Sequence, residues 1–195
     1  MNNRLLCGVL WICGETIVPE RLAGFQLSFN FTERIRNFGG YDMARAKWQV
    51  LVIPYFIENE TVQYCIFHRS DMDVWQFIAG GGEDEDESAI MSAKREAYEE
   101  AGIKMNAAYF QLDTHCSIPA SCFKKAQEIW GKEVLVIPEY SFAVMCKDRY
   151  IKISHEHKSY EWVGYAEAVK RLKYDSNKTA LWELDTRIKR GLYSK

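Results

Sequence analysis

Apolar and polar residues alternate along the chain in blocks that predict a series of strands. Residues 48–56 and 61–69 are two β-branched and aromatic runs, and the polar residues 58–60 between them indicate a turn, so a β-hairpin is expected. The shorter run 74–78 predicts a third strand that ends at three consecutive glycines. Further strands are predicted at 107–117, 133–137, 140–147 and 160–165.

Four other segments have the composition of helices. Residues 88–101 are rich in Ala, Glu, Lys, Arg and Met, lack Gly and Pro, and stop at Gly102. Helices are also predicted at 122–130, 166–172 and 176–191. Strands with helices between them, several of the strands joined by hairpins, indicate a mixed α/β fold built in layers.

The first part of the chain differs in pattern from the rest. The chain of 195 residues is long enough for one ordinary domain and short for two. A turn signal at 37–42 precedes the first clear strand, so we expect a domain at 43–195 and an added extension, residues 1–42, of unknown role. The apolar run 5–13 weakly resembles a signal peptide, but no small-residue cleavage site follows it, and a short strand or packed extension is expected.

Composition narrows the classes of function. The chain has 25 basic and 27 acidic side chains, so its charge gives no general reason to expect nucleic-acid or membrane binding. None of the six cysteines forms a Cys-x-x-Cys pair or has a histidine at zinc-finger spacing. This pattern predicts reduced thiols in a cytoplasmic protein. No segment approaches the length of a membrane span.

The strongest chemical signal is the dense run of carboxylates in residues 80–103. It lacks the central glycine of an EF-hand loop, which excludes a calcium loop of that type. Residues 83–86 fit a hydrated acidic loop. Glu96, Glu99 and Glu100 lie at i, i+3 and i+4 on one face of the predicted helix, where like charges repel. Divalent cations collect carboxylate oxygens, so this face is a candidate metal site.

The order of residues in this run is that of the Nudix box. Outside the box, the segment 156–162 is similar to one in dihydroneopterin triphosphate pyrophosphatases and asymmetric diadenosine tetraphosphatases, and 174–184 is similar to one in the former. The chain therefore resembles the Nudix hydrolase family over about residues 44–192. The resemblance implies the Nudix fold, a mixed sheet packed between helices in an α/β/α sandwich. The box match comprises Gly81, Glu87, Arg95, Glu96, Ala97, Glu99, Glu100, Gly102 and Ile103.

The resemblance also implies roles for individual residues. Arg95 would orient the glutamates, and the general base would be Glu96 or Glu156. Arg69, Trp75 and His157 are candidates for substrate contact, with a surface salt bridge as the alternative for Arg69 and a plain loop position for His157. A solvated loop glutamate is the alternative for Glu156. Ligands to Mg²⁺ or Mn²⁺ would come from Gly80, Glu87, Glu96, Glu99, Glu100 and Glu156.

The implied reaction is cleavage of a phosphate–phosphate bond by a metal-activated water. The substrate would be a nucleoside triphosphate, dihydroneopterin triphosphate or a related nucleoside diphosphate derivative, so the expected partner is a small nucleotide or pterin-type phosphate. A homodimer is compatible with the sequence.

Three other functions are known on the same fold. A nucleotide-sensing Nudix domain is the main alternative, although such domains typically lose box glutamates that this chain keeps. An isomerase would need a catalytic cysteine motif, which neither Cys65 nor Cys116 shows. RNA decapping lacks the support of a basic stripe.

Overall fold

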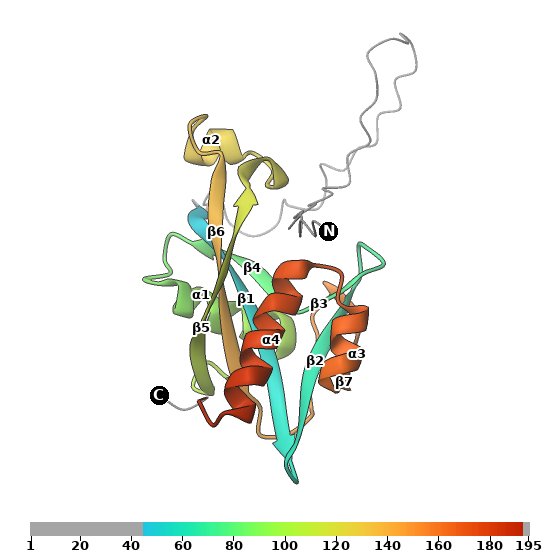
Figure 1. The fold of residues 1–195 in the computed structure, drawn as a ribbon. Helices are drawn as coiled ribbons and strands as arrows, with labels where there is room; N and C mark the ends of the chain where they lie inside the picture. Colours follow the sequence, from blue (N-terminus) through green and yellow to red (C-terminus); the bar gives the residue numbers. More distant parts are fainter. Residues whose placement is uncertain (1–44, 193–195) are drawn as a thin grey trace, which may run out of the picture. The chain divides into compact units, whose positions relative to one another are not determined.

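The long strand β1 (Arg45–Glu58) is the centre of a mixed sheet (Figure 1). The computed structural model describes residues 45–192, so the expected extension 1–42 lies outside the described residues. β1 pairs antiparallel with β2 (Thr61–Arg69) and β4 (Ile78–Glu83), and parallel with β6 (Val136–Met145). Three further strands complete seven: β3 (Trp75–Gln76) and β7 (His157–Val163) beside β2, and β5 (Ala108–Pro119) beside β6.

Alternating side chains on β1 give the sheet two apolar faces. Leu51, Ile53 and Tyr55 belong to the core on one side, and Val50 and Val52 belong to the core on the other. All five are buried, as expected for a strand covered on both faces. Each face therefore needs its own layer of helices.

The helices supply these two layers. α1 (Ala89–Ala101) packs through the alanines Ala93, Ala97 and Ala101 on one face, which we call the α1 face. α3 (Tyr165–Arg171) and α4 (Asp175–Lys189) pack on the other, which we call the α4 face. The predicted α/β/α arrangement is confirmed.

A short arm joins the ends of β5 and β6. It contains the 3₁₀ turn η1 (Ala120–Cys122) and α2 (Ala126–Trp130), and it lies away from α3 and α4 (Figure 1). Its small apolar cluster includes Ile118, Trp130 and Ile137. The indole N–H of Trp130 donates to the Arg45 carbonyl at 2.5 Å, which ties the arm to the start of β1.

Two predicted strand boundaries are wrong. The third strand was expected to stop at the glycines, but β4 runs through all three of them because Gly80 and Gly81 pair with Val50 and Gln49 of β1. The runs 133–137 and 140–147 were expected to be separate strands, but they contribute to one strand, β6.

The cysteines only partly match the prediction of reduced thiols. Cys65, Cys116 and Cys146 are free, whereas Cys122 is disulfide-bonded. Within residues 45–192, no helix is both long and apolar enough to cross a membrane.

Candidate active site

Helix α1 presents its three glutamates at three depths. The side chain of Glu100 is only 4% exposed, that of Glu96 is 12% exposed, and that of Glu99 is 54% exposed. The helix ends at Gly102, whose φ of 67° is the left-handed conformation that favours glycine at this position. The box glutamates therefore lead from the core to solvent along one stripe of the helix.

The glycines of β4 allow close approach from both faces of the sheet. A Cβ on Gly80 would lie 2.0 Å from Cδ of Glu96, so only glycine leaves room for that carboxylate. A Cβ on Gly81 would lie 2.4 Å from Nε of Arg45. Because successive residues of a strand face opposite sides, the glycine backbone separates a carboxylate from a guanidinium.

Arg95 organises the exposed end of the site. Its Nη1 donates to Oε1 of Glu96 at 3.0 Å and to Oε2 of Glu99 at 3.2 Å, and its Nη2 donates to the Gly81 carbonyl at 2.7 Å. These bonds hold two glutamates and strand β4 in a fixed relation, which is the positioning role implied for Arg95.

Asp86 also belongs to this network, so the prediction of a hydrated loop is wrong for that residue. Its side chain is only 9% exposed, and Oδ2 accepts a bond from Arg95 at 2.9 Å and one from the Glu83 backbone N–H at 3.0 Å. Burial opposes ionisation, but these bonds hold the pKa of Asp86 below its usual value. No spacing rule distinguished Asp86 from its acidic neighbours.

Buried Glu100 is held by His157 of β7. Nε2 of His157 lies 2.8 Å from Oε2 of Glu100, and the histidine side chain is fully buried. Burial lowers the pKa of His157 to about 4, so the ring is neutral near pH 7. Nδ1 is buried without a hydrogen-bond partner in residues 45–192, which favours the tautomer that donates from Nε2 to Glu100. The His157 ring in this position contacts Glu100 and has no exposed surface that a substrate could contact.

The surroundings of Glu96 and Glu100 disfavour the charged form of both carboxylates. Burial raises the pKa of each to about 8. Arg95 partly opposes this shift at Glu96, while the charge of Glu156 adds to it at Glu100. Two neighbouring carboxylates in a buried place favour a shared proton or a bound cation.

The donor chemistry of this pair fits a divalent metal ion, because Mg²⁺ and Mn²⁺ prefer carboxylate oxygens. Across the described residues, however, no group of three or more His, Cys, Asp or Glu side chains is arranged to hold one. Glu99 is engaged by Arg95, and Glu87 is exposed. Glu96 and Glu100 thus lie together, Gly80 lies against Glu96, and the charges of Glu99 and Glu156 reach Glu100, whereas Glu87 is exposed.

Glu156 lies on the loop that joins β6 to β7, and this loop passes next to the end of α1. The Ser154 N–H donates to the Glu100 carbonyl at 2.9 Å, and the Ser70 N–H donates to the Glu156 carbonyl at 2.8 Å. These bonds place Glu156 close enough for its charge to affect the pKa of Glu100. The solvated alternative is weakened because Glu156 is partly buried.

The other predicted substrate residues have partners of their own. Arg69 forms a bidentate ion pair with Asp71, with both N–O distances at 2.6 Å, so the salt-bridge alternative describes its state. Trp75 packs with the core of the α4 face, stacks on His68 at 4.8 Å and contacts the Arg171 guanidinium at 3.9 Å. Trp75 is therefore not among the residues that surround the box glutamates.

Arg45 was missed by the sequence analysis. Its guanidinium lies over Gly81 and 4.7 Å from the Phe123 ring centroid, and its Nε is buried without a hydrogen-bond partner in the described part of the chain. Burial lowers the pKa of Arg45, and the charge of Glu96 partly restores it. The sequence shows only a basic residue before a strand, which gave no signal.

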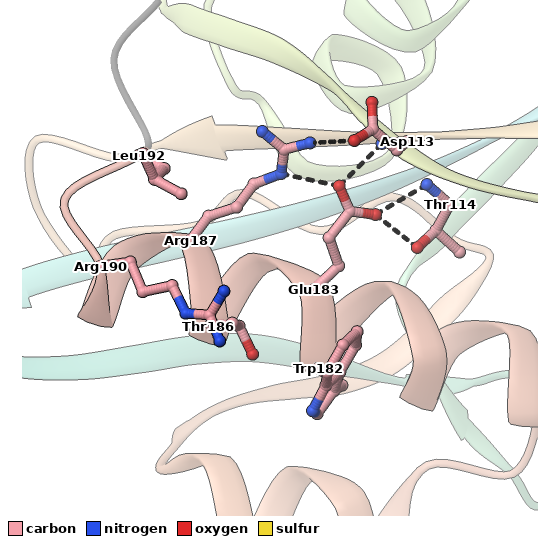
Figure 2. A pocket seen from close by; sticks show the side chains of 8 residues that line it. All are labelled: Asp113, Thr114, Trp182, Glu183, Thr186, Arg187, Arg190 and Leu192. Carbon is pink, nitrogen blue, oxygen red and sulfur yellow. Dashed lines mark hydrogen bonds and ion pairs between the residues drawn. The ribbon is translucent and has the colours of Figure 1, made fainter.

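A second buried carboxylate, Glu183, lies in α4 away from the box. Its oxygens accept bonds from the backbone N–H groups of Asp113 and Thr114, both at 2.7 Å, and from Nε of Arg187 at 2.7 Å (Figure 2). The Thr114 hydroxyl is a further donor. Glu183 lines a cavity of about 540 Å³ together with Trp182 and other residues of α4. These bonds satisfy the backbone where the pairing of β5 with β6 shifts register.

Comparisons with known proteins agree with this geometry. The model of the NUDIX domain family matches residues 48–182. A Listeria monocytogenes protein assigned to the NUDIX hydrolases is 42% identical, with 74% of this chain and 96% of that chain covered and a TM-score of 0.67. A search of curated proteins finds no match.

Two more distant structures share the fold. The dihydroneopterin triphosphate pyrophosphohydrolase of E. coli is 22% identical, with 73% of this chain and 99% of that chain covered and a TM-score of 0.58. The Ap4A hydrolase of C. elegans is 18% identical, with 74% and 99% covered and a TM-score of 0.55. Because the family model spans most of the chain and the glutamates of the box are assembled on α1, this protein belongs to the Nudix hydrolase family.

Proposed function

We propose that the protein is a metal-dependent pyrophosphohydrolase that cleaves a phosphate–phosphate bond in a nucleoside triphosphate, dihydroneopterin triphosphate or a related nucleoside diphosphate derivative. The observation that carries the proposal is the pair Glu96 and Glu100, whose side chains lie on one face of α1 only 12% and 4% exposed, where burial and the neighbouring carboxylates raise both pKa values. Charge crowding of this kind costs stability in a purely structural site. It is expected where a cation binds.

Each residue of the site has a task in this proposal. Glu96 and Glu100 would hold Mg²⁺ or Mn²⁺, with Glu99, the Gly80 carbonyl and Glu156 as the further oxygen donors of the predicted set. When bound, the ion would neutralise phosphate charge and lower the pKa of a water molecule. Arg95 keeps Glu96 and Glu99 in place through its hydrogen bonds.

The proton-transfer and positioning roles follow from burial. Glu96 and Glu156 remain the candidates for the general base, since both are partly buried and neither is locked in a bidentate pair. We assign His157 to positioning, because it fixes Glu100 through a 2.8 Å hydrogen bond from inside the protein.

Arg45 is a better candidate for phosphate binding than Arg69. The guanidinium of Arg69 is occupied by Asp71, whereas Nε of Arg45 is buried without a partner within residues 45–192. Arg45 also lies close enough to Glu96 for the carboxylate to affect its pKa. An arginine between an aromatic ring and a glycine backbone is a suitable donor to a substrate phosphate.

The test is a hydrolysis screen with and without Mg²⁺, covering nucleoside triphosphates, dihydroneopterin triphosphate, dinucleoside polyphosphates and nucleotide sugars. Glu99→Gln and Glu100→Gln should each lower turnover by about two orders of magnitude or more, as expected when a charge-stabilising group is lost. Wild-type rates in both variants would refute the assignment of the site. Tight nucleotide binding without hydrolysis of any substrate would favour the sensing alternative.

A further inference from the structure

The outer side of α4 carries a row of largely exposed residues. Trp182 lies at the centre of the row and is 57% exposed. Thr179 and Thr186 lie about one helical turn from it on either side, and Asp175 and Arg190 lie about two turns from it. Residues at this spacing share one face of a helix, and we call this row the α4 stripe. No other element of residues 45–192 passes over this side of α4 (Figure 1).

A hollow lies beside the α4 stripe. The cavity of about 540 Å³ described above is lined by Trp182, Thr186 and Arg190 of the stripe and by Leu192, which is 46% exposed. Figure 2 shows Glu183 pointing toward β5, whereas Trp182 projects from a different side of the helix. The stripe therefore combines an exposed indole with a hollow that another side chain can enter.

The two ends of the stripe carry opposite charges. Arg187 and Lys189 each have an acidic partner, whereas the side chain of Arg190 forms no ion pair within residues 45–192. At the other end, the side chain of Asp175 is 73% exposed and lies 3.4 Å from Lys178. An exposed ion pair of this kind contributes little, so another cation can replace Lys178 at small cost. Both end charges are thus available to groups outside the chain.

The order of residue types along the stripe is the same from either end, except that the end charges are exchanged. If a second copy packs antiparallel about a two-fold axis at Trp182, each Asp175 faces Arg190 of the second copy. Each Thr179 then faces Thr186 of the second copy, and these short side chains let the helices approach closely. The two indoles meet at the centre, where aromatic rings attract each other.

The charges also exclude the parallel arrangement. A parallel pair of helices would bring Asp175 against Asp175 and Arg190 against Arg190, and like charges across an interface repel. Burial of the threonines adds little cost, because the Thr179 hydroxyl already donates to the Asp175 carbonyl at 2.9 Å. The stripe is therefore complementary to itself in one orientation only.

We propose that the α4 stripe is an interface that binds a second copy of this chain, with the two α4 helices antiparallel. The inference does not depend on the proposed function, because no residue of the stripe is assigned to the reaction. A single pair of helices in contact over about 22 Å makes a small interface. The dimer is therefore expected to be reversible, with a Kd in the micromolar range.

The first experiment reverses the end charges in two separate variants of the full chain, Asp175→Arg and Arg190→Asp. Each variant alone places like charges at both ends of the interface, so its Kd for dimerisation should rise by about 10–100-fold. A mixture of the two variants restores opposite charges at both ends and should associate with a Kd close to that of wild type. Sedimentation velocity over a concentration series measures wild type, both variants and the mixture.

Glu128→Arg is the matched control, because it reverses an acidic charge in the first turn of α2, outside the stripe, and should leave the Kd unchanged. Thermal unfolding of each variant checks that the fold is intact. A wild-type chain that stays monomeric would overturn the proposal. Single variants that dimerise as wild type does, or a mixture that fails to associate, would overturn it as well.

Trp182→Ala tests the centre of the interface. Aromatic side chains at the centre of an interface commonly carry much of the binding energy, so the Kd should rise by about 30-fold or more. Tyr150→Ala removes an aromatic side chain that is 77% exposed outside α4 and should leave the Kd unchanged. A wild-type Kd in Trp182→Ala would show that any dimer forms through another surface, and the proposal would then be wrong.

Discussion

The acidic sites of α1 and α4 use the same side chain under similar burial and reach opposite electrostatic states. Side chains of Glu96 and Glu183 are 12% and 11% exposed. Burial raises the pKa of Glu96 to about 8. It acts in the same direction on Glu183, but hydrogen bonds from Thr114, Asp113 and Arg187 outweigh it and lower that pKa.

The difference lies in the donors around each carboxylate. Glu183 receives bonds from two backbone N–H groups, a hydroxyl and the Arg187 guanidinium, and that guanidinium also pairs with the nearby Asp113 carboxylate. Glu96 has a bond from Arg95 but lies beside Glu100 and Glu99. A fully satisfied carboxylate stabilises the fold, whereas a crowded one keeps binding capacity for a ligand.

The largest expected effect is a difference in kcat between variants of the two sites. Glu96→Gln should reduce kcat by about two to three orders of magnitude, because it removes a charge at the proposed reaction centre. Glu183→Gln should retain a kcat within about threefold of wild type, because α4 supplies no group to the reaction. Steady-state kinetics on the best substrate of the screen checks both, and equal losses would erase the distinction.

The second-largest expected effect is a difference between the two sites in how Mg²⁺ changes thermal stability. An ion bound at a hundred times its Kd adds about 2.7 kcal/mol to the free energy of unfolding, and this raises Tm by about 5–10 °C in a domain of this size. The increase should disappear in Glu100→Gln and persist in Glu183→Gln. Thermal scans with Mg²⁺ and with a chelator measure it, and an unchanged Tm in wild type would count against the metal site.

Loss of the satisfied carboxylate should lower stability instead. Glu183→Gln removes the charge from four hydrogen bonds, and we expect about 1–3 kcal/mol less free energy of unfolding near pH 7. Glu96→Gln should cost less or even stabilise the metal-free protein, because it relieves repulsion. Urea denaturation of both variants gives the comparison, and the opposite ranking would contradict it.

The smallest effect is a dependence on pH. The pKa of Glu183 is lower in the folded state than its ordinary value of 4.5, so its contribution is complete above that value and is lost as the pH falls through the folded-state pKa. The difference in unfolding free energy between wild type and Glu183→Gln should therefore shrink below about pH 4.5. A difference that stays constant down to pH 3 would show that packing rather than charge is responsible.

The sequence predicts the part of the site that depends on local spacing. The box fixes Glu96, Glu99 and Glu100 on one helical stripe, and the apolar runs predict most of the strands, because both depend on residues near one another in the chain. The roles of His157 and Arg45 depend on contacts between segments far apart in the chain, and that of Asp86 depends on the folding of its loop against Arg95. Neither residue type nor periodicity encodes such contacts, so Asp86 and Arg45 were not expected in the site and His157 was expected to contact substrate rather than Glu100.

The strand boundary at the glycines failed for a related physical reason. Glycine has a low intrinsic preference for strands, so a run of three glycines predicts the end of a strand. In the folded protein, the close approach of Glu96 to Gly80 and of Arg45 to Gly81 outweighs that preference. Strand propensity therefore predicted the wrong boundary, because the tertiary structure requires residues without side chains at these positions.

The bare glycine strand also has a consequence for how the protein can diverge. The glutamates come from α1 on one side of it, while Gln49, Cys116, Glu139 and Ser176 come from β1, β5, β6 and α4 on the other. We expect substitutions on the second side to leave the glutamates of α1 in place. The two sides of this strand can therefore be altered separately, so that one face is rebuilt while the glutamates on the other are kept.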